Sequence, residues 1–305
     1  MVYTVTLNPA LDYNLYLNNV NEGAVNRVDR AAVLCGGKGI NVSFVLNELG
    51  VDNVALGFVA SFTGAELERR LRLSHIVTDF ITLKNGFTRI NVKIKAEKET
   101  DLNAPGPEID GESLLKLLER VSALDKADIL CLSGSVPKNC PEDIYSSMLE
   151  IAAQKGVKTV VDAEGKLLLN CLKYNPFLIK PNTAELEGIF ETQIKSDDEI
   201  IKYAYELCKM GAENVVVSCG KDGAILVSKK GVYKALSPKG KAINTVGSGD
   251  SLVAGFIAEY QKSGNCEKAL KLGVAAGSAT AFSEKIAQKG EILSLIEKVE
   301  IEKIR

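Results

Sequence analysis

Short apolar runs, rich in β-branched residues, alternate along the chain with longer stretches whose apolar residues recur at helical spacing. The apolar runs predict strands at residues 2–7, 54–59, 128–133, 158–163, 176–180 and 214–218. The amphipathic stretches predict helices at 112–122, 141–154, 183–190, 197–210 and 266–281, and the segment 297–305 is expected to be a solvated helical end. Most of these strands are apolar on both faces, which is typical of a parallel sheet covered by helices on each side. The pattern therefore predicts a single α/β domain over residues 1–305, with a doubly wound, mainly parallel sheet.

Two segments, 11–17 and 88–95, have a different pattern, because apolar and polar residues alternate strictly in both. Strict alternation gives a strand one apolar and one polar face, so these strands do not fit a sheet that is buried on both sides. We interpret them as strands of a small projecting β-sheet, a lid formed by about residues 11–35 and 85–104. Such a sheet could cover a site, form a dimer interface, or do both.

Composition narrows the possible functions. Charged residues make up 25% of the 305 residues and the net charge is −2, so no basic field indicates binding to nucleic acid or to a membrane surface. The opening residues show neither a signal peptide nor a membrane span, and the odd count of seven cysteines without CxxC spacing fits reduced thiols, so a cytoplasmic protein is expected. The single histidine excludes histidine-based triads and multi-histidine metal sites, which leaves proton transfer to a carboxylate.

Two glycine-rich stretches precede helical patterns. NTVGSGDS, residues 244–251, predicts a turn that opens a helix with Asp250 in its first turn, and its small residues would leave backbone N–H groups open to an anion. An ordinary loop with an aspartate cap is the alternative. CGGKGINVSFVLNELG, residues 35–50, places Lys38 among glycines at a helix start, which suits a phosphate or a sugar hydroxyl, although a tight turn with an exposed lysine has the same pattern. Neither stretch is a P-loop or a dinucleotide fingerprint.

These two stretches resemble the two signatures of the PfkB (ribokinase-like) carbohydrate kinases. TLNPALDYN at 6–14, SGSVP at 133–137 and KPNTAE at 180–185 resemble the phosphosugar branch of that family, the 1-phosphofructokinases and tagatose-6-phosphate kinases. The resemblance spans nearly the whole chain in family order, although Asn244 and Ser248 replace the Asp and Ala of many members.

The resemblance implies a ribokinase-like fold and an ATP- and Mg²⁺-dependent kinase that converts fructose 1-phosphate to fructose 1,6-bisphosphate. A tagatose-6-phosphate kinase is the alternative, and a non-catalytic sugar-phosphate sensor on the same fold is a less favoured one. The implied partners are the phosphosugar, ATP and a second copy of the chain bound through the lid. A need for a monovalent cation is left open.

The resemblance also implies a role for each matched residue. Asp250 would be the base, and the backbone N–H groups of Gly247, Ser248 and Gly249 would stabilise charge on the transferring phosphoryl group. The residues implied for sugar hydroxyls are Asp12, Gly37 and Asn41, and those implied for the sugar phosphate are Lys38, Arg89 and Ser135. The residues implied for the nucleotide phosphates and hydrated Mg²⁺ are Lys180, Asn182 and Glu185, with Glu185 acting on the metal through water. Those implied for the rest of the nucleotide site are Ser218, Gly220, Gly277 and Ser278.

Simpler interpretations exist for single residues of this set. Asn182 and Glu185 have the spacing of a helix capping box. Arg89 could be a solvated charge on an exposed strand, and Ser135 could be a turn residue before a proline.

Overall fold

The structure is a computed structural model that describes residues 1–138 and 140–305. The main sheet is built from β1 (Val2–Thr6), β4 (Asn53–Ala60), β5 (Val77–Leu83), β8 (Ile129–Ser133), β9 (Lys158–Asp162), β10 (Leu178–Ile179), β11 (Asn214–Ser218), β12 (Ala224–Ser228), β13 (Gly231–Leu236) and β14 (Glu300–Lys303). Their order across the sheet is β14-β13-β12-β11-β10-β9-β8-β1-β4-β5. The strands from β11 to β5 run parallel, while β12, β13 and β14 are antiparallel to their neighbours, so the sheet is mainly parallel as predicted.

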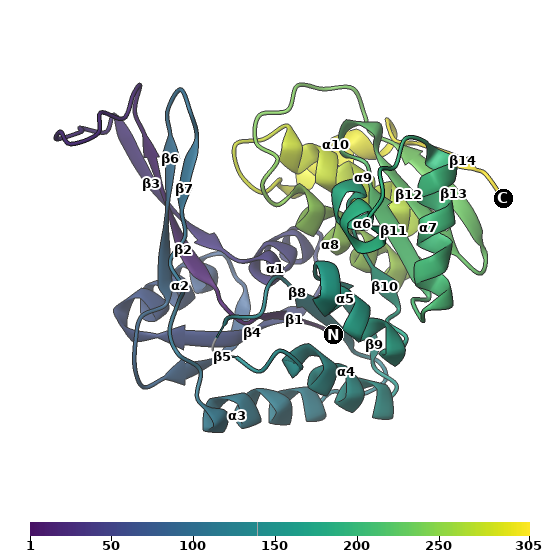
Figure 1. Cartoon of the computed structure of the whole chain (residues 1–305), viewed down its shortest axis with the longest axis horizontal. Coiled ribbons are helices and arrows are strands. Elements are labelled where there is room, and N and C mark those ends of the chain that lie inside the picture. Colours follow the sequence, from purple (N-terminus) through teal and green to yellow (C-terminus); the bar gives the residue numbers. More distant parts are fainter. Residues whose placement is uncertain (139) are drawn as a thin grey trace.

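Helices cover both faces of this sheet (Figure 1). They are α1 (Lys38–Glu48), α2 (Ser61–Leu73), α3 (Gly111–Ser122), α4 (Ile144–Gln154), α5 (Gly165–Cys171), α6 (Thr183–Phe190), α7 (Asp197–Lys209), α8 (Ser248–Ser263), α9 (Cys266–Ala281) and α10 (Lys289–Ile296). One face carries α3 to α7, and the other carries α1, α2 and α8 to α10. The predicted α/β architecture is thereby confirmed.

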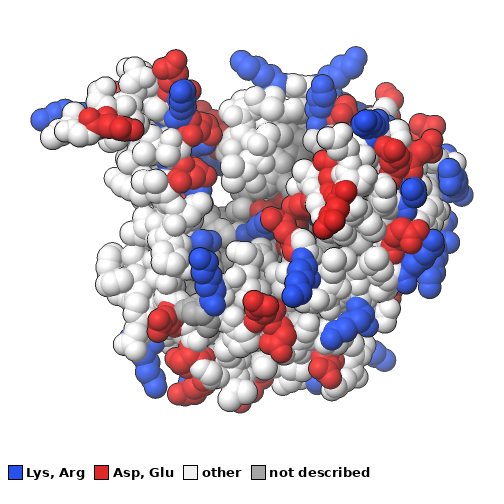
Figure 2. All heavy atoms as spheres, viewed as in Figure 1, with Lys and Arg blue, Asp and Glu red and all other residues white. Residues whose placement is uncertain are grey.

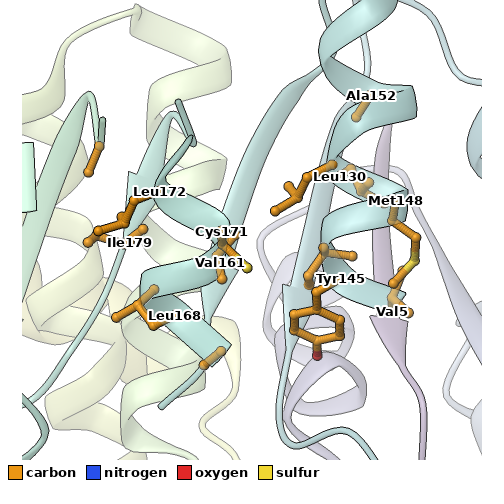
Figure 3. Packing of buried hydrophobic residues seen from close by; sticks show 14 of the residues in the cluster. Val5, Leu130, Tyr145, Met148, Ala152, Val161, Leu168, Cys171, Leu172 and Ile179 are labelled. Atoms are coloured by element: carbon orange, nitrogen blue, oxygen red, sulfur yellow. The ribbon is translucent and has the colours of Figure 1, made fainter. Parts of the chain in front are cut away.

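Buried side chains join the strands to the helices (Figure 3). On the face of α4, Leu130 of β8 packs in one cluster with the fully buried Tyr145 and Met148. Further along the same face, Ile179 of β10 belongs to this cluster with Leu168 of α5. Side chains at successive strand positions enter opposite clusters, which explains why the strands are apolar on both faces.

The lid is a separate four-stranded sheet made of β2 (Ala10–Tyr16), β3 (Arg30–Gly36), β6 (Arg89–Lys95) and β7 (Thr100–Leu102), in the order β3-β2-β6-β7. It projects from one end of the main body (Figure 1). The two segments predicted from strict alternation, 11–17 and 88–95, correspond to β2 and β6, which pair in parallel. These two strands are neighbours in space although more than seventy residues separate the two segments in the sequence.

The expected helical end at 297–305 is wrong. Residues Glu300–Lys303 form β14, which extends the main sheet by pairing with β13. Val299 is buried and Ile301 is half-buried, while Glu300 and Glu302 are exposed, so the segment has the period of two that suits an edge strand. No helix in the described part of the chain has the length and hydrophobicity that crossing a bilayer requires.

Candidate active site

The carboxyl ends of the central parallel strands open onto a cavity of about 500 Å³, here called the first cavity. Residues at or just after the ends of β1, β8, β9, β10 and β11 all line it. Open α/β sheets bind ligands at this edge, because parallel strands bring their carboxyl ends together there. Figure 2 shows a hollow between the lid and the rest of the molecule, with charged side chains of both signs around its floor.

Predicted residues from distant motifs line this first cavity. They are Asp12, Gly37, Lys38, Asn41, Arg89, Ser135, Lys180, Asn182, Glu185, Ser218, Gly247, Gly249 and Asp250. A second cavity of about 620 Å³ adjoins it, since Asn182, Ser218 and Gly249 line both. The second cavity holds the remaining predicted residues, which are Ser248, Gly220, Gly277 and Ser278.

The turn at the start of α8 has the geometry of an anion-binding backbone. Gly247 has φ 83, in the left-handed region that glycine adopts without strain. The N–H of Ser248 donates to the carbonyl oxygen of Thr245 at 3.2 Å, whereas those of Gly247 and Gly249 have no acceptor among the described residues. A Cβ on Gly249 would lie 3.1 Å from Nζ of Lys180, so glycine lets this lysine approach the turn. Two of the three N–H groups predicted to bind an anion therefore have no acceptor among the described residues, whereas the third forms a hydrogen bond within the turn.

Asp250 lies in the first turn of α8 and is only 5% exposed. Its Oδ2 accepts a hydrogen bond of 2.8 Å from Nδ2 of Asn41 on α1. Burial and the nearby Asp162 carboxylate raise the pKa of Asp250 to about 6, against the opposing effects of Asn41, Lys38 and Lys180. A carboxylate with such a pKa is charged at neutral pH yet basic enough to accept a proton in catalysis.

The lid supplies two of the predicted sugar-binding side chains. Asp12 of β2 lies beside Asn91, its register partner on β6, and Nδ2 of Asn91 donates to Oδ1 of Asp12 at 2.8 Å. Arg89 begins β6, and its Nε donates to the carbonyl oxygen of Asn8 at 3.1 Å. Both side chains are therefore held by neighbouring strands or loops with their positions fixed toward the first cavity.

The capping-box interpretation of Asn182 and Glu185 describes the observed contacts. The side chain of Asn182 accepts from the Glu185 N–H at 2.8 Å, and Oε2 of Glu185 accepts from the Asn182 N–H at 2.9 Å. This cap opens α6 directly after β10 and orients both residues on the wall of the first cavity. A structural role and a ligand-binding role are compatible here, because the cap uses only one oxygen of Glu185.

The second cavity is lined mainly by apolar and small groups. Leu252 and Val274 come from α8 and α9, and Phe282 follows α9. The loop 237–240 faces them, and its Gly240 packs so closely on the Phe282 ring that a Cβ there would lie 2.4 Å from it. An apolar slot of this kind suits a flat aromatic base next to the polar first cavity.

Comparison with known proteins identifies the family of the chain. Residues 5–289 match the model of the pfkB family of carbohydrate kinases. The chain belongs to the pfkB family.

Relatives of this pfkB-family chain include several sugar-phosphate kinases. It is 42% identical over 304 residues to a 1-phosphofructokinase of Bacillus subtilis (strain 168), with 100% of each chain covered. It is 37% identical to a D-tagatose-1-phosphate kinase of Bacillus licheniformis, with 99% of each covered. A crystal structure of phosphofructokinase-2 from Escherichia coli in complex with substrates and products has a TM-score of 0.92 and 27% identity, covering 97% of this chain and 98% of the other. Other structures of that protein contain potassium or show a tetrameric inhibited form.

Several residues at the site of this pfkB-family chain were not predicted from its sequence. Asp162 ends β9 and lines the first cavity. Its place at the end of a predicted strand could have indicated a site residue, because open α/β sheets bind ligands at strand ends. Asn91 holds Asp12, and its position on the polar face of an alternating strand was also visible in the sequence. No pattern in the sequence indicated that the loop 237–240 lines the second cavity, because its place there depends on packing against Phe282.

Proposed function

We propose that this pfkB-family chain transfers the γ-phosphoryl group of ATP to fructose 1-phosphate and releases fructose 1,6-bisphosphate and ADP. The observation that carries the proposal is the first cavity, where two cationic side chains, Lys38 and Arg89, accompany a buried carboxylate, Asp250. Cations bind the phosphate already on the sugar, and a buried carboxylate accepts the proton of the reacting hydroxyl. Full-length similarity to a protein named 1-phosphofructokinase supports this substrate.

In the proposed reaction, Asp250 accepts the proton of the sugar C6 hydroxyl as that oxygen attacks the γ-phosphorus. The bond from phosphorus to the bridging oxygen of ADP breaks in the same displacement. The open N–H groups of Gly247 and Gly249 support the proposal that this turn stabilises charge on the moving phosphoryl group. Asp12, Gly37 and Asn41 hold the sugar hydroxyls, while Lys38, Arg89 and Ser135 bind its phosphate.

The nucleotide is proposed to span both cavities, with its base in the second. Lys180 and Asn182 then bind its phosphates, and Ser218, Gly220, Gly277 and Ser278 surround the rest of the molecule. Mg²⁺ would neutralise phosphate charge, and it usually keeps several waters when a protein binds it. The carboxylate of Glu185 fits such a hydrated ion, because its cap leaves one oxygen on the cavity wall.

We further propose that the chain acts as one domain and forms a homodimer through the lid. The apolar face of β2, β6 and β7 supports this, since Tyr13, Ile90 and Leu102 are exposed there. Seven free thiols and the use of ATP favour the reducing cytoplasm as its compartment.

A tagatose phosphate is the second candidate substrate. The similarity to a D-tagatose-1-phosphate kinase favours a tagatose that carries its phosphate at the same end as fructose 1-phosphate. Tagatose 6-phosphate would have to bind in the opposite sense, with its phosphate at Lys38 and its C1 hydroxyl at Asp250. A non-catalytic sensor is disfavoured, because a sensor does not need a buried base.

The test is kcat/KM with ATP and Mg²⁺ for fructose 1-phosphate, tagatose 1-phosphate, tagatose 6-phosphate and free fructose. Fructose 1-phosphate is expected to give the highest value, and free fructose a value lower by roughly 10²-fold or more, because its missing phosphate leaves two cations unused. Comparable values for fructose and its 1-phosphate would contradict the proposal. The assay is run in potassium and in sodium buffers, since the Escherichia coli relative has been seen with potassium.

A further inference from the structure

A buried carboxylate outside the predicted site lies between two of its lysines. Asp162 is 1% exposed, and its Oδ1 is 3.4 Å from Nζ of Lys180 and 3.6 Å from Nζ of Lys38. Neither oxygen of Asp162 accepts a hydrogen bond from any residue that the structure describes. Buried carboxylates normally have hydrogen-bond donors, so this one requires a specific explanation.

The two lysines belong to different parts of the site. Lys38 begins α1 on the side of the predicted sugar phosphate, whereas Lys180 follows β10 on the side of the predicted nucleotide phosphates. Lys180 is only 5% exposed, and its Nζ lies where a Cβ on Gly249 would come within 3.1 Å of it. One oxygen of Asp162 therefore joins the cationic groups on both sides of the reacting centre.

Charge balance explains why a carboxylate is needed at this place. The two lysines and the two buried aspartates, Asp162 and Asp250, carry no net charge among themselves. The other charged residues that line the first cavity are not buried, and they are Asp12, Arg89, Glu164 and Glu185. If Asp162 were neutral, Asp250 would be the main buried counter-ion of both ammonium groups. Each ammonium group would then be attracted to the carboxylate that is proposed as the base. Glu164 also lies 3.6 Å from Lys38, but it is 68% exposed and therefore a weaker partner.

The lengths of these ion pairs matter for binding. A charge-assisted hydrogen bond from an ammonium to a carboxylate is about 2.7–2.9 Å long. The contacts to Asp162 are longer, so they orient the ammonium groups without occupying them fully. Both lysines keep donors for phosphate oxygens.

We propose that Asp162 is a positioning residue, whose carboxylate holds Lys38 and Lys180 toward the two phosphate groups and keeps them away from Asp250. The proposal rests on the proposed function only in that a phosphosugar and ATP bind on the two sides of this carboxylate.

The charge of Asp162 also acts on its neighbours. Burial alone would lower the pKa of Lys38, but Asp162, Asp250, Glu164 and Glu185 together raise it. Asp162 raises the pKa of Asp250, which Asn41, Lys38 and Lys180 lower. In the parent, kcat/KM should fall at acid pH as Asp250 is protonated, and this fall is called the acid limb of the pH profile. The neutral variant Asp162→Asn should therefore move the acid limb to lower pH.

The experiment compares Asp162→Asn with the parent in steady-state kinetics from pH 5 to 8. KM for ATP and for the phosphosugar should both rise, kcat/KM should fall by roughly 10-fold or more, and the acid limb should shift to lower pH. The matched control is Asp128→Asn, which removes a carboxylate that pairs with the amino group of Met1 at 3.0 Å before β8, at the other edge of the sheet. This control should leave KM, kcat and the acid limb unchanged.

Unchanged kinetics in Asp162→Asn, or a loss of activity without a shift of the acid limb, would overturn the proposal. Rates are measured with whichever phosphosugar the parent uses best, so a wrong substrate assignment is detected separately in the parent. If Asp162→Asn does not fold, Asp162→Glu provides the test, because it keeps the charge but displaces it. It should lower kcat/KM by roughly 10-fold with the acid limb at the pH of the parent, and unchanged kcat/KM would overturn the proposal.

Discussion

Burial decides the role of Asp250 more than its place in the sequence does. An acidic residue in the first turn of a helix is common, because it interacts favourably with the helix dipole. At 5% exposure, with Asn41 as its hydrogen-bond donor, Asp250 instead becomes a carboxylate with a raised pKa on the wall of a polar cavity. Those properties favour a base over a helix cap.

Asp250→Asn tests this role directly. The amide keeps the shape of the side chain but does not accept the proton, so kcat should fall by roughly 10²-fold or more while ATP binding is retained. Isothermal calorimetry with ATP and steady-state rates provide the two measurements. A kcat within a few-fold of the parent would exclude the role of base.

The pH dependence of the parent gives an independent test. Activity requires the unprotonated carboxylate, and the pKa of Asp250 is raised to about 6 from 3.8. The value of kcat/KM should therefore decrease as the pH falls through about 6, which is well above the range where an ordinary aspartate is protonated. A flat profile down to pH 5 would contradict this assignment.

At the level of elements, two parts of the fold, the lid and the start of α1, place side chains in the first cavity. The polar face of the lid brings Asp12 and Arg89, and the start of α1 brings Lys38 and Asn41. Each of these elements has a glycine-rich or alternating pattern in the sequence. Taken alone, each pattern is explained by a tight turn or an exposed strand without any ligand. Their convergence on one cavity favours recognition of an anionic substrate.

Lys38→Ala and Arg89→Ala test the recognition of the sugar phosphate. Each should lower kcat/KM for the phosphosugar by roughly 10-fold or more and leave the low activity toward free fructose nearly unchanged, because free fructose has no phosphate to bind. Lys93→Ala is the matched control, since Lys93 lies on the same face of β6 but pairs with Asp101 at 2.7 Å and lines neither cavity. Equal losses for both sugars would show that these cations do not bind the phosphate.

At the level of the whole molecule, the lid projects from the body (Figure 1). One face of the lid carries exposed apolar side chains. On that face Val92 of β6 lies between Tyr13 of β2 and Leu102 of β7. Tyr13 is 38% exposed and Leu102 is 56% exposed. Contiguous exposed apolar surface of this kind usually marks an interaction site, and a two-fold dimer is the simplest way to cover it.

The lid dimer predicts the effect of a charge at the centre of this face. The parent should be a dimer by light scattering at micromolar concentration, and Val92→Lys should shift it toward monomer, because the contact would bury an unpaired ammonium. Leu115→Lys on α3 is the control, since Leu115 is 62% exposed and lies on another element. A monomeric parent, or a Val92→Lys dimer as stable as the parent, would contradict the prediction.

The sequence by itself determined most of the main sheet and its helices. The predicted elements 183–190, 214–218 and 266–281 coincide with α6, β11 and α9, because periodicity is a local property of the chain. The quoted motifs also contained most of the predicted site residues, since glycine-rich turns and polar strand ends are local features as well. The predicted site residues outside these motifs are Arg89, Ser218, Gly220, Gly277 and Ser278. The family assignment followed from these motifs and was confirmed by the match over residues 5–289.

Only the tertiary structure decided the features that depend on residues far apart in the chain. The alternation of apolar and polar residues over 299–302 suits a strand but covers only four residues, and pairing with β13 settles the choice. The sequence patterns also did not predict strands at β3, β5, β7, β12 and β13, which complete the two sheets. The role inferred for Asp162 requires lysines that lie more than a hundred residues apart, at positions 38 and 180. Local patterns specify which element a segment can form, whereas burial and charge pairing arise only after the chain has folded.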